Sequence, residues 1–562
     1  MKQLARIRLY VSTIRYLKTL QILYQIKSRI AGSWKAVMRA ALQHRPVPEH
    51  RRIQILIPEL DETDEYVKRF HPDTLFSGEV MLLHEKHALH WEVCEASHLW
   101  NYNLHYLEFL IPLAVKYKQS HDMRYLKKWR GIVSSWLRNG SKAPDAFEPY
   151  TISLRIPSLL ICLELLGEDI GSGLENDIYA SIYQQYRYLL HNQELALLAN
   201  HYFENLKTIV ICSVVFDEPR VYHKYFRLFV RQIYEQILPD GMHFERSIMY
   251  HKIILEGILR VTVTLRNSGY RADAGRLLPA VRAMADALYG LEHGFEKTPL
   301  FNDAGDNISK RAEQLLFASK KYGGWKKGRA ETAFPYAGYY RLDNGSISLL
   351  FDCGEIGPAY MSGHSHNDCL SFELAVKGRS VFTNSGTGQY QGSRRQFFRS
   401  TPAHNTVMID NREQSELWGE HRAGRRLLNT RAFVREKEVS GQFYSYEGDF
   451  FQRRMAWAGS ELQITDYVRS CKKGICTARQ FFHLAPGYHY QKKGHVIAVH
   501  SDSGIVAEIA VPRNMEIKIH TEGALTAFAG EFGKYEKKEV LETAIQFERS
   551  IRLYAAIKIA EA

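Results

Sequence analysis

Cysteine is scarce in this 562-residue sequence and forms no pattern. The seven cysteines are scattered along the chain, and no C-x-x-C spacing occurs among them. An odd, scattered set argues against a disulfide framework and against a thiolate zinc site. We therefore expect buried free thiols.

Long apolar runs and targeting signals are also missing. The sequence has no run of roughly 18 apolar residues, so hydropathy indicates no transmembrane segment. The N-terminus carries basic residues throughout and has neither the apolar core nor the cleavage site of a secretory signal. These absences favour a protein that is cytoplasmic or peripheral to the inner membrane, with a periplasmic location as the alternative.

Known nucleotide- and nucleic-acid-binding motifs do not occur either. The glycines of Gly386-Thr387-Gly388 match neither a Rossmann nor a P-loop pattern. The formal net charge is +13, which either favours an anionic partner or is only a solvated basic surface. An acidic polysaccharide and an acidic membrane surface remain as partners, whereas nucleic acid is disfavoured because no binding motif supports it.

The first 75 residues are a basic extension, helical at first and then containing several prolines. Apolar residues between Leu9 and Ile26 recur at helical spacing among lysines and arginines. Such a helix either lies on an anionic membrane surface or packs on the protein body with its charges toward water. We favour the second arrangement, and peripheral membrane contact stays open as the first.

The rest of the chain divides into two parts of different periodicity. Residues 76–330 contain consecutive helix-period segments joined by short polar links, such as 153–166 and 195–215. From 331 to 562, short alternating runs broken by Gly, Asn and Asp indicate antiparallel strands. The pattern predicts a multidomain α+β protein in which an all-α domain precedes an antiparallel β-sandwich.

Two histidines stand just ahead of a predicted strand that follows residue 370. His364 and His366 are two apart, so in an extended backbone their side chains share one face. Imidazole exchanges protons near neutrality and is a common metal ligand. This strand edge is therefore a natural place for chemistry.

Two predicted helices carry further reactive groups. His201 and Glu204 are three apart, so the carboxylate would orient the imidazole and raise its basicity. Ser247 would cap a second helix with Tyr250 in its first turn, where Arg246 and the helix N-terminus would favour the phenolate. Taken singly, each group is more typical of core packing than of catalysis.

A basic cluster lies between the histidines. Arg394, Arg395 and Arg399 suit a carboxylate or a sulfate, and Tyr390 precedes them after a glycine-containing turn. A third histidine, His404, precedes another predicted strand. These residues extend the candidate site into the second half of the chain.

In combination, these motifs resemble those of the heparinase II/III-like polysaccharide lyases, a group that includes alginate lyases of similar build. Five matching pieces occur in the family's order over about residues 95–420. They are 100–106, Asn200-His201 with Glu204, Glu245-Arg246-Ser247 with Tyr250-His251, 363–368 and 403–406. The resemblance implies an incomplete (α/α) toroid over 76–330, a β-sandwich over 331–562 and an active cleft between them.

The resemblance also implies catalytic roles for Asn200, His201, Tyr250 and His364 in β-elimination from a uronate. Asn200 and His364 would neutralise the carboxylate so that the C5 proton can be removed. Tyr250 would act as acid, and also as base when both events lie on one face of the ring, whereas His201 would be the base for the opposite epimer. The expected substrate-binding residues are Glu204 (which would orient His201), Tyr390, Arg394 and Arg395.

Some members of this family hold a structural zinc ion beneath the site, and His366 and His404 match two of its ligands. The third family ligand is usually an aspartate, but this sequence has Asn384, which is a neutral and weaker ligand. His366, Asn384 and His404 therefore form either a zinc site or a hydrogen-bonded group without metal.

The leading hypothesis is a polysaccharide lyase acting on a uronate-containing acidic polysaccharide. A uronate C5-epimerase is an alternative because it would use the same residues. A non-catalytic glycan-binding protein of a surface-polysaccharide pathway is the alternative outside enzymology.

Overall fold

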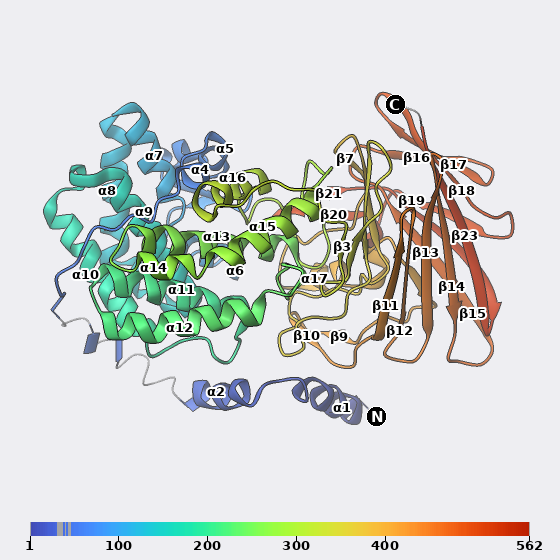
Figure 1. Cartoon of the computed structure of the whole chain (residues 1–562), viewed down its shortest axis with the longest axis horizontal. Coiled ribbons are helices and arrows are strands. Elements are labelled where there is room, and N and C mark those ends of the chain that lie inside the picture. The colour runs from blue at the N-terminus through green and yellow to red at the C-terminus, as the bar shows by residue number, and fades with distance from the viewer. Residues whose placement is uncertain (1, 31–37, 40, 43–45, 561–562) are drawn as a thin grey trace.

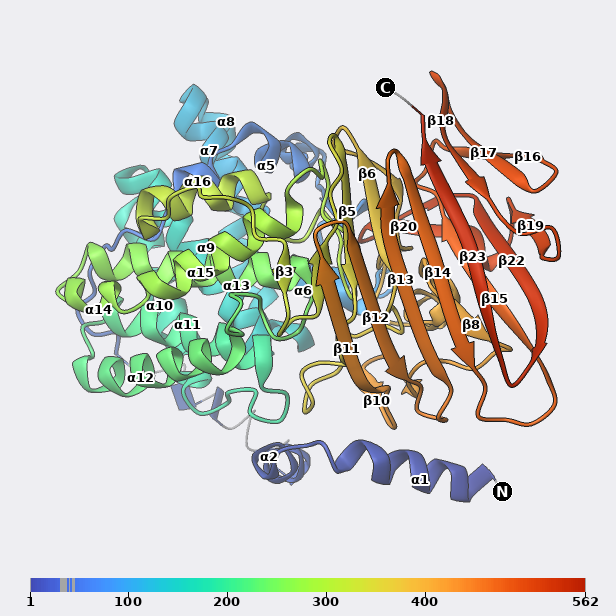
Figure 2. The same ribbon diagram turned by 45° about the vertical axis from the view of Figure 1, so that its right-hand side comes forward.

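The computed structural model describes residues 2–30, 38–39, 41–42 and 46–560. A helical domain lies beside a β-domain, and two N-terminal helices run beneath both (Figures 1 and 2). The multidomain α+β class and the order of the two domains are those predicted.

The helical domain is an open ring of helix hairpins. Four inner helices, α7, α9, α11 and α13, contact one another in succession, and α8, α10, α12 and α14 each pack on the preceding inner helix. Inner helices such as α11 are buried on nearly every face, whereas outer helices such as α12 bury one face only. The main helices are α6 (His98–Tyr106), α7 (Leu110–Ser120), α8 (Met123–Arg138), α9 (Pro149–Leu166), α10 (Ser172–Leu189), α11 (Ala199–Val215), α12 (Pro219–Gln236), α13 (Ile248–Arg266), α14 (Arg271–Gly275), α15 (Leu278–Glu292) and α16 (Ala312–Gly323). This is the expected incomplete toroid.

The helical domain begins before residue 76, contrary to the expected boundary. Helices α4 (Pro58–Asp61) and α5 (Asp64–Arg69) belong to it, and Ile57 and Leu60 are buried in the same core as the ring helices. Asp61 is fully buried against Arg260 of α13. The last part of the predicted extension therefore belongs to the helical domain, because its apolar residues pack in the core.

Antiparallel sheets make up the β-domain. One sheet has the order β3-β4-β5-β6-β7, a second β19-β22-β15-β8, and the largest β11-β12-β13-β14-β23-β18-β17-β16. Thr383 N–H donates to His483 O at 3.1 Å, which joins the first two sheets into one layer. Their strands are β3 (Ala333–Phe334), β4 (Tyr339–Arg341), β5 (Ile347–Asp352), β6 (Phe372–Val376), β7 (Arg379–Phe382), β8 (Val407–Ile409), β11 (Leu428–Arg435), β12 (Glu438–Tyr444), β13 (Phe450–Ala458), β14 (Glu461–Arg469), β15 (Ile475–His483), β16 (His489–Lys493), β17 (Val496–Ser501), β18 (Gly504–Ala510), β19 (Glu516–His520), β22 (Val540–Glu548) and β23 (Ser550–Ile559).

The β-domain is a sandwich because side chains from this layer and from the largest sheet share one core. Phe372 of β6, Met455 of β13 and Ile557 of β23 are all fully buried in it. Arg453 and Asp466 form a fully buried ion pair on neighbouring strands of the largest sheet. His364 and His404 lie in the loops that precede β6 and β8, and His364 lines a cavity shared with the helical domain.

The sequence indicated neither disulfide bonds nor a transmembrane segment, and the cysteines and the most apolar helix bear on these two points. All seven cysteines are free, but Cys94 and Cys471 are exposed, so the expectation of burial is wrong for these two. Helix α9 is long and apolar enough to cross a bilayer, yet 78% of its most apolar window is buried inside the toroid.

The N-terminal extension contains two helices rather than one. These are α1 (Lys2–Ile14) and α2 (Thr19–Ile30), which meet at a break near residue 16. Trp418 Nε1 of the β-domain donates to Thr13 Oγ1 at 3.0 Å, so α1 packs on the protein body as favoured from the sequence.

Candidate active site

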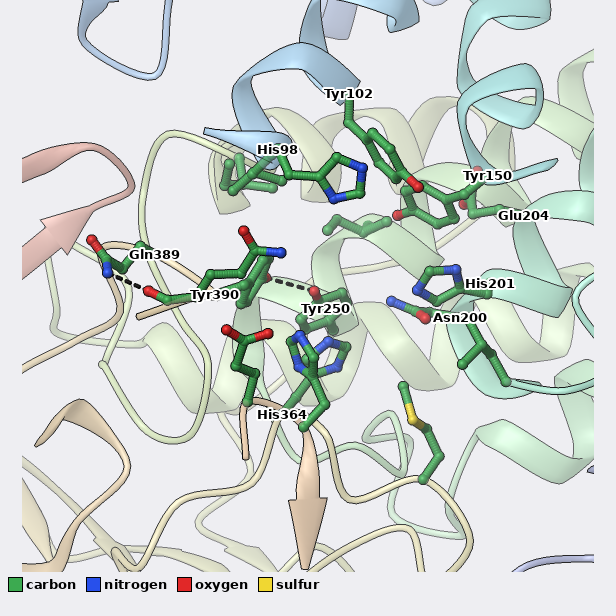
Figure 3. A pocket seen from close by; sticks show the side chains of 18 of the residues that line it. His98, Tyr102, Tyr150, Asn200, His201, Glu204, Tyr250, His364, Gln389 and Tyr390 are labelled. Atoms are coloured by element: carbon green, nitrogen blue, oxygen red, sulfur yellow. Dashed lines mark hydrogen bonds between the residues drawn. The ribbon is translucent and has the colours of Figure 1, made fainter. Parts of the chain in front are cut away.

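A cavity of about 1440 Å³ lies between the toroid and the sandwich. Helices α6, α11 and α13 line one side. The loops at 359–364 and 388–392 and the start of helix α17 (Ser393–Phe398) line the other. Figure 3 shows Asn200, His201, Tyr250 and His364 gathered on it. The four side chains predicted to be catalytic thus meet in one open space.

Asn200 and His201 sit in the first turn of α11, where the backbone makes a sharp turn. Leu198 has φ 64° and Ala199 φ 49°, both in the left-handed region that residues with a Cβ rarely occupy. The expected helix over 195–215 therefore begins only at Ala199. The turn places the Asn200 amide at the helix N-terminus, and its buried Oδ1 has no partner among the described residues.

Glu194, not Glu204, orients His201. Nδ1 of His201 lies 2.9 Å from Glu194 Oε1, and Asn205 Nδ2 holds the other carboxylate oxygen at 3.1 Å. Burial lowers the pKa of His201, but attraction to the Glu194 carboxylate outweighs it and leaves that pKa above its usual value. Glu204 instead forms a buried ion pair with Lys207, so the role assigned to it from helical spacing is wrong.

Tyr250 lies on α13 and is protonated at neutral pH. Ser247 caps the helix as predicted, accepting from the Tyr250 N–H at 3.2 Å. Burial, with Tyr390 nearby, raises the pKa of Tyr250 well above 10, contrary to the expected phenolate. Arg246 does not lower it, because its guanidinium donates to the backbone carbonyls of Glu355 and Tyr336.

The Tyr250 phenol is held between two groups of the β-domain. Its hydroxyl lies 2.6 Å from that of Tyr390, and its ring stacks on His364 with centroids 4.0 Å apart. His364 Nδ1 in turn hydrogen-bonds to Glu245 Oε2. The sheet domain therefore fixes both the hydroxyl and the ring face of the helical-domain tyrosine.

Glu245 connects the two halves of the site. One carboxylate oxygen bonds to His364, and the other accepts from the Asn200 N–H at 3.3 Å. Burial raises the pKa of Glu245, but attraction to His364 prevails and lowers it, so the group is ionised. The sequence motif around Tyr250 contained Glu245, but nothing in its spacing indicated this bridge.

The two arginines expected to bind substrate differ from each other. Arg395 is fully buried, pairs with Asp303 and donates to Gly363 O at 2.8 Å, so it fixes the His364 loop and cannot contact substrate. Arg394 is exposed and lies over the Tyr535 ring at 4.3 Å, beside the cavity. Its role as a substrate contact stays a prediction.

His366 and His404 come together with a carboxylate beneath the site. Ligand atoms of His366, Asp368 and His404 lie within 4.8 Å of one another. His366 Nε2 bonds to Asp303 at 2.9 Å. The other ring nitrogen of His366, Nδ1, and the Nε2 atom of His404 are both buried and have no hydrogen-bond partner in the described part of the chain. Asn384 does not complete this trio as expected, because its Oδ1 bonds to His404 Nδ1 at 3.0 Å.

Several cavity residues were not predicted individually. Tyr102 and Tyr106 of α6 and Tyr150 of α9 line the cavity, and the Tyr150 ring lies 4.4 Å from that of His201. A phenol near an imidazole gives a sugar ring both an apolar face and a hydrogen-bonding edge. The abundance of tyrosine in the sequence was the available signal, but it does not indicate which tyrosines gather.

The cavity walls carry little free positive charge. In the described ranges, six Lys or Arg residues and six Asp or Glu residues line the cavity, so the lining is formally neutral. Each cation already has a partner. The contacts are Lys207 with Glu204, Arg260 and Lys310 with Asp61, Arg426 with Ala359 O, Arg69 with Ile308 O, and Arg422 over the Trp418 ring.

Protein-family comparison covers most of the chain in two consecutive pieces. The model described as "Heparinase II/III N-terminus" matches residues 58–322, and "Heparinase II/III-like, C-terminal" matches 326–551. The chain belongs to the heparinase II/III-like family. The junction of the two matches coincides with the observed change from helices to strands.

Named relatives of this heparinase II/III-like chain are distant. The heparin-sulfate lyase of Bacteroides thetaiotaomicron is 23% identical over 406 residues, covering 61% of this chain and 57% of that protein. The heparin-sulfate lyase of Pedobacter heparinus is 24% identical over 359 residues, covering 57% and 53%. The matched region thus spans about half the length of these relatives.

Solved structures extend the likeness of the fold. The crystal structure of heparinase III superposes with a TM-score of 0.70 at 15% sequence identity, covering 96% of this chain and 91% of that chain. At this identity the match establishes the toroid and sandwich and leaves the reaction to be argued from the site.

Proposed function

We propose that this protein is a polysaccharide lyase that cleaves a uronate-containing acidic polysaccharide by β-elimination. The observation that supports it is the convergence of Asn200, His201, Tyr250 and His364 on one cavity between the domains. An amide, two imidazoles and a phenol are the groups needed to hold a carboxylate and to move two protons.

Removal of the weakly acidic C5 proton requires the uronate carboxylate to be neutralised. The Asn200 amide, at the N-terminus of α11, and the His364 ring would donate to that carboxylate. Glu245 would fix the position of Asn200 relative to His364, because its carboxylate bonds to both residues. Charge that develops on the enolate would thus meet fixed donors.

Proton transfer is divided between Tyr250 and His201. Because the pKa of Tyr250 is raised, its hydroxyl carries a proton that it can donate to the departing 4-oxygen. His201, whose pKa is raised by Glu194, is the base for a substrate whose C5 proton lies on the opposite face. For the other epimer Tyr250 would have to lose its own proton before it could take the one from C5, so only its ionised fraction would serve as base. The Tyr390 hydroxyl, 2.6 Å away, could donate a hydrogen bond to that phenolate.

The substrate we propose carries carboxylates but few sulfates. Sulfated chains need unpaired Arg or Lys side chains, and the cations that line this cavity are already engaged. Tyrosine rings such as Tyr102 and Tyr150 suit the apolar faces of neutral sugars between the uronates.

A structural metal ion fits beneath the site. The two unpartnered histidine nitrogens and the Asp368 carboxylate form a donor set typical of zinc. His366, Asp368 and His404 would hold the ion, and Asp303 and Asn384 would orient the two imidazoles from behind. When bound, the ion would cross-link the segments that carry His364 and His404.

The test is turnover of a panel of uronate polymers, followed by the ultraviolet absorbance of the unsaturated product. Wild-type protein should cleave at least one polymer, and Tyr250→Phe should lose about 10²–10⁴-fold in rate. Tyr125→Phe is the matched control, since it removes a hydroxyl bonded to Asp73 outside the cleft. Deuterium uptake at C5 without cleavage would indicate the epimerase, and binding without either reaction would indicate a glycan-binding protein.

A further inference from the structure

The positive charge of the chain is concentrated at its N-terminus. Residues 1–48 contain ten Lys or Arg and no Asp or Glu, so the remaining residues contribute only +3 of the net +13. These ten are Lys2, Arg6, Arg8, Arg15, Lys18, Lys27, Arg29, Lys35, Arg39 and Arg45. The lining of the cleft is formally neutral, and the described members of these ten cations are not among the residues that line it.

One side of the N-terminal helices is anchored on both domains. Lys18 forms an ion pair with Glu235 of the toroid, and Gln21 Nε2 donates to Leu197 O at 3.1 Å and to Tyr360 O at 3.2 Å. With the Trp418 contact to α1, these bonds make the pair a strap across the junction (Figures 1 and 2). The strap is thus a docked element whose other side faces away from the body.

The outward side of the strap is apolar and flanked by cations. Ile7 and Val11 are 59% and 63% exposed, and their spacing of four places them on one stripe of α1, whereas Ile14, 49% exposed, lines the cavity. Leu20 and Leu23 of α2 are likewise exposed, at 42% and 58%. Among the cations, the Arg8, Arg15 and Lys27 side chains are exposed.

We propose that this strap, defined as α1 and α2, docks the protein on an anionic lipid surface. Large apolar side chains in a row next to Arg and Lys, with no acidic residue, are typical of helices that lie in the membrane interface. Exposed apolar rows are uncommon on proteins without a surface to cover them. An acidic polysaccharide would engage the cations but would leave Val11 and Leu23 in water.

Docking through the strap places the cleft at the membrane. Thr13 of α1, Gln21 of α2 and Leu17 between the two helices line the cavity, whereas Val11 and Leu23 do not. The cleft opening beside the strap would therefore lie close to the bilayer, within reach of glycan chains at its surface. This geometry does not depend on the reaction that the cleft performs.

The experiment is co-sedimentation of the full-length protein with vesicles of phosphatidylcholine alone or mixed with phosphatidylglycerol. We expect binding to the anionic vesicles only, weakened by salt and by about fivefold for each cation removed in Arg8→Gln and Arg15→Gln. Val11→Glu with Leu23→Glu should abolish binding. Ile475→Glu is the matched control, since Ile475 is 68% exposed on the sandwich and should have no effect.

Two results would overturn the proposal. One is failure of the wild type to bind anionic vesicles while near-ultraviolet circular dichroism shows it folded. The other is vesicle binding that survives Val11→Glu with Leu23→Glu. Binding to immobilised acidic polysaccharide through Arg8 and Arg15, without any vesicle binding, would count in the same way as the first result. Turnover of a soluble glycan should be unchanged in these variants, so loss of docking and loss of catalysis can be told apart.

Discussion

Replacing Glu194 by Gln tests whether this residue tunes the base. Glu194→Gln keeps the shape of the side chain but removes the charge that opposes the effect of burial on the pKa of His201. That pKa should therefore fall. Because His201 acts as a base only when neutral, the acid limb of the kcat/KM profile should move to lower pH.

The size of the rate effect follows from the contact. A hydrogen bond to a charged group is worth about 1.5–3 kcal/mol. The lower end of this range applies because the side chains of His201 and Glu194 are 24% and 14% exposed, so solvent screens their interaction in part. About 1.4 kcal/mol corresponds to tenfold, so on the alkaline plateau, where His201 is neutral in both proteins, kcat/KM should fall about tenfold.

The assay is the pH profile of unsaturated-product formation with oligosaccharides containing either C5 epimer of the uronate. Glu204→Gln is the matched comparison, because Glu204 pairs with Lys207 and raises the pKa of His201 less than Glu194 does, so the acid limb should move less. The limb should move with only one epimer, the one whose proton faces His201. An unmoved limb with both epimers, or an equal movement in Glu204→Gln, would refute the assignment.

Three further predictions concern the acid, the toroid core and the metal site. Tyr390→Phe removes the hydroxyl that lies 2.6 Å from that of Tyr250, and it should lower kcat about tenfold. This loss is far smaller than the loss expected for Tyr250→Phe. Equal losses of kcat in steady-state assays of the two variants would assign the acid role to the pair. Asp61→Asn leaves buried Arg260 and Lys310 without their carboxylate and should cost about 3–5 kcal/mol in urea unfolding near neutral pH. By contrast, Asp122 is only partly buried and pairs with exposed Arg124, so Asp122→Asn should change little. Burial raises the pKa of Asp61, but attraction to Arg260 prevails and lowers it, so its stabilisation is complete above about pH 4. The Asp61→Asn deficit should then shrink as pH falls through that lowered pKa, and a constant deficit would contradict this. His404→Ala should abolish zinc retention by mass spectrometry, and Asn384→Ala should weaken it about 10–100-fold; equal retention in all three proteins would exclude the site.

Local spacing in the sequence predicted those parts of the site that depend on local geometry. Ser247 caps the helix of Tyr250 because capping is decided within four residues. The change from helical to alternating periodicity predicted the toroid and the sandwich, because periodicity is also a local property of the sequence.

Contacts made through loops or across the fold could not be predicted. Glu194 reaches His201 only because the chain turns through left-handed residues at Leu198 and Ala199. Arg395 meets Asp303, 92 positions away, and only the docking of the two domains buries this pair. Helical spacing therefore assigned Glu204 to His201, and buried Arg395 was mistaken for a substrate contact.

The central claim is that the cleft breaks a uronate glycosidic bond by elimination. Mass spectrometry of the products formed in deuterated water tests this most directly. The account predicts that each cleavage yields a non-reducing end lighter by one water than the hydrolysis product, and that Tyr250→Phe forms this product about 10²–10⁴-fold more slowly. Saturated ends, or intact chains carrying deuterium at C5, would contradict it.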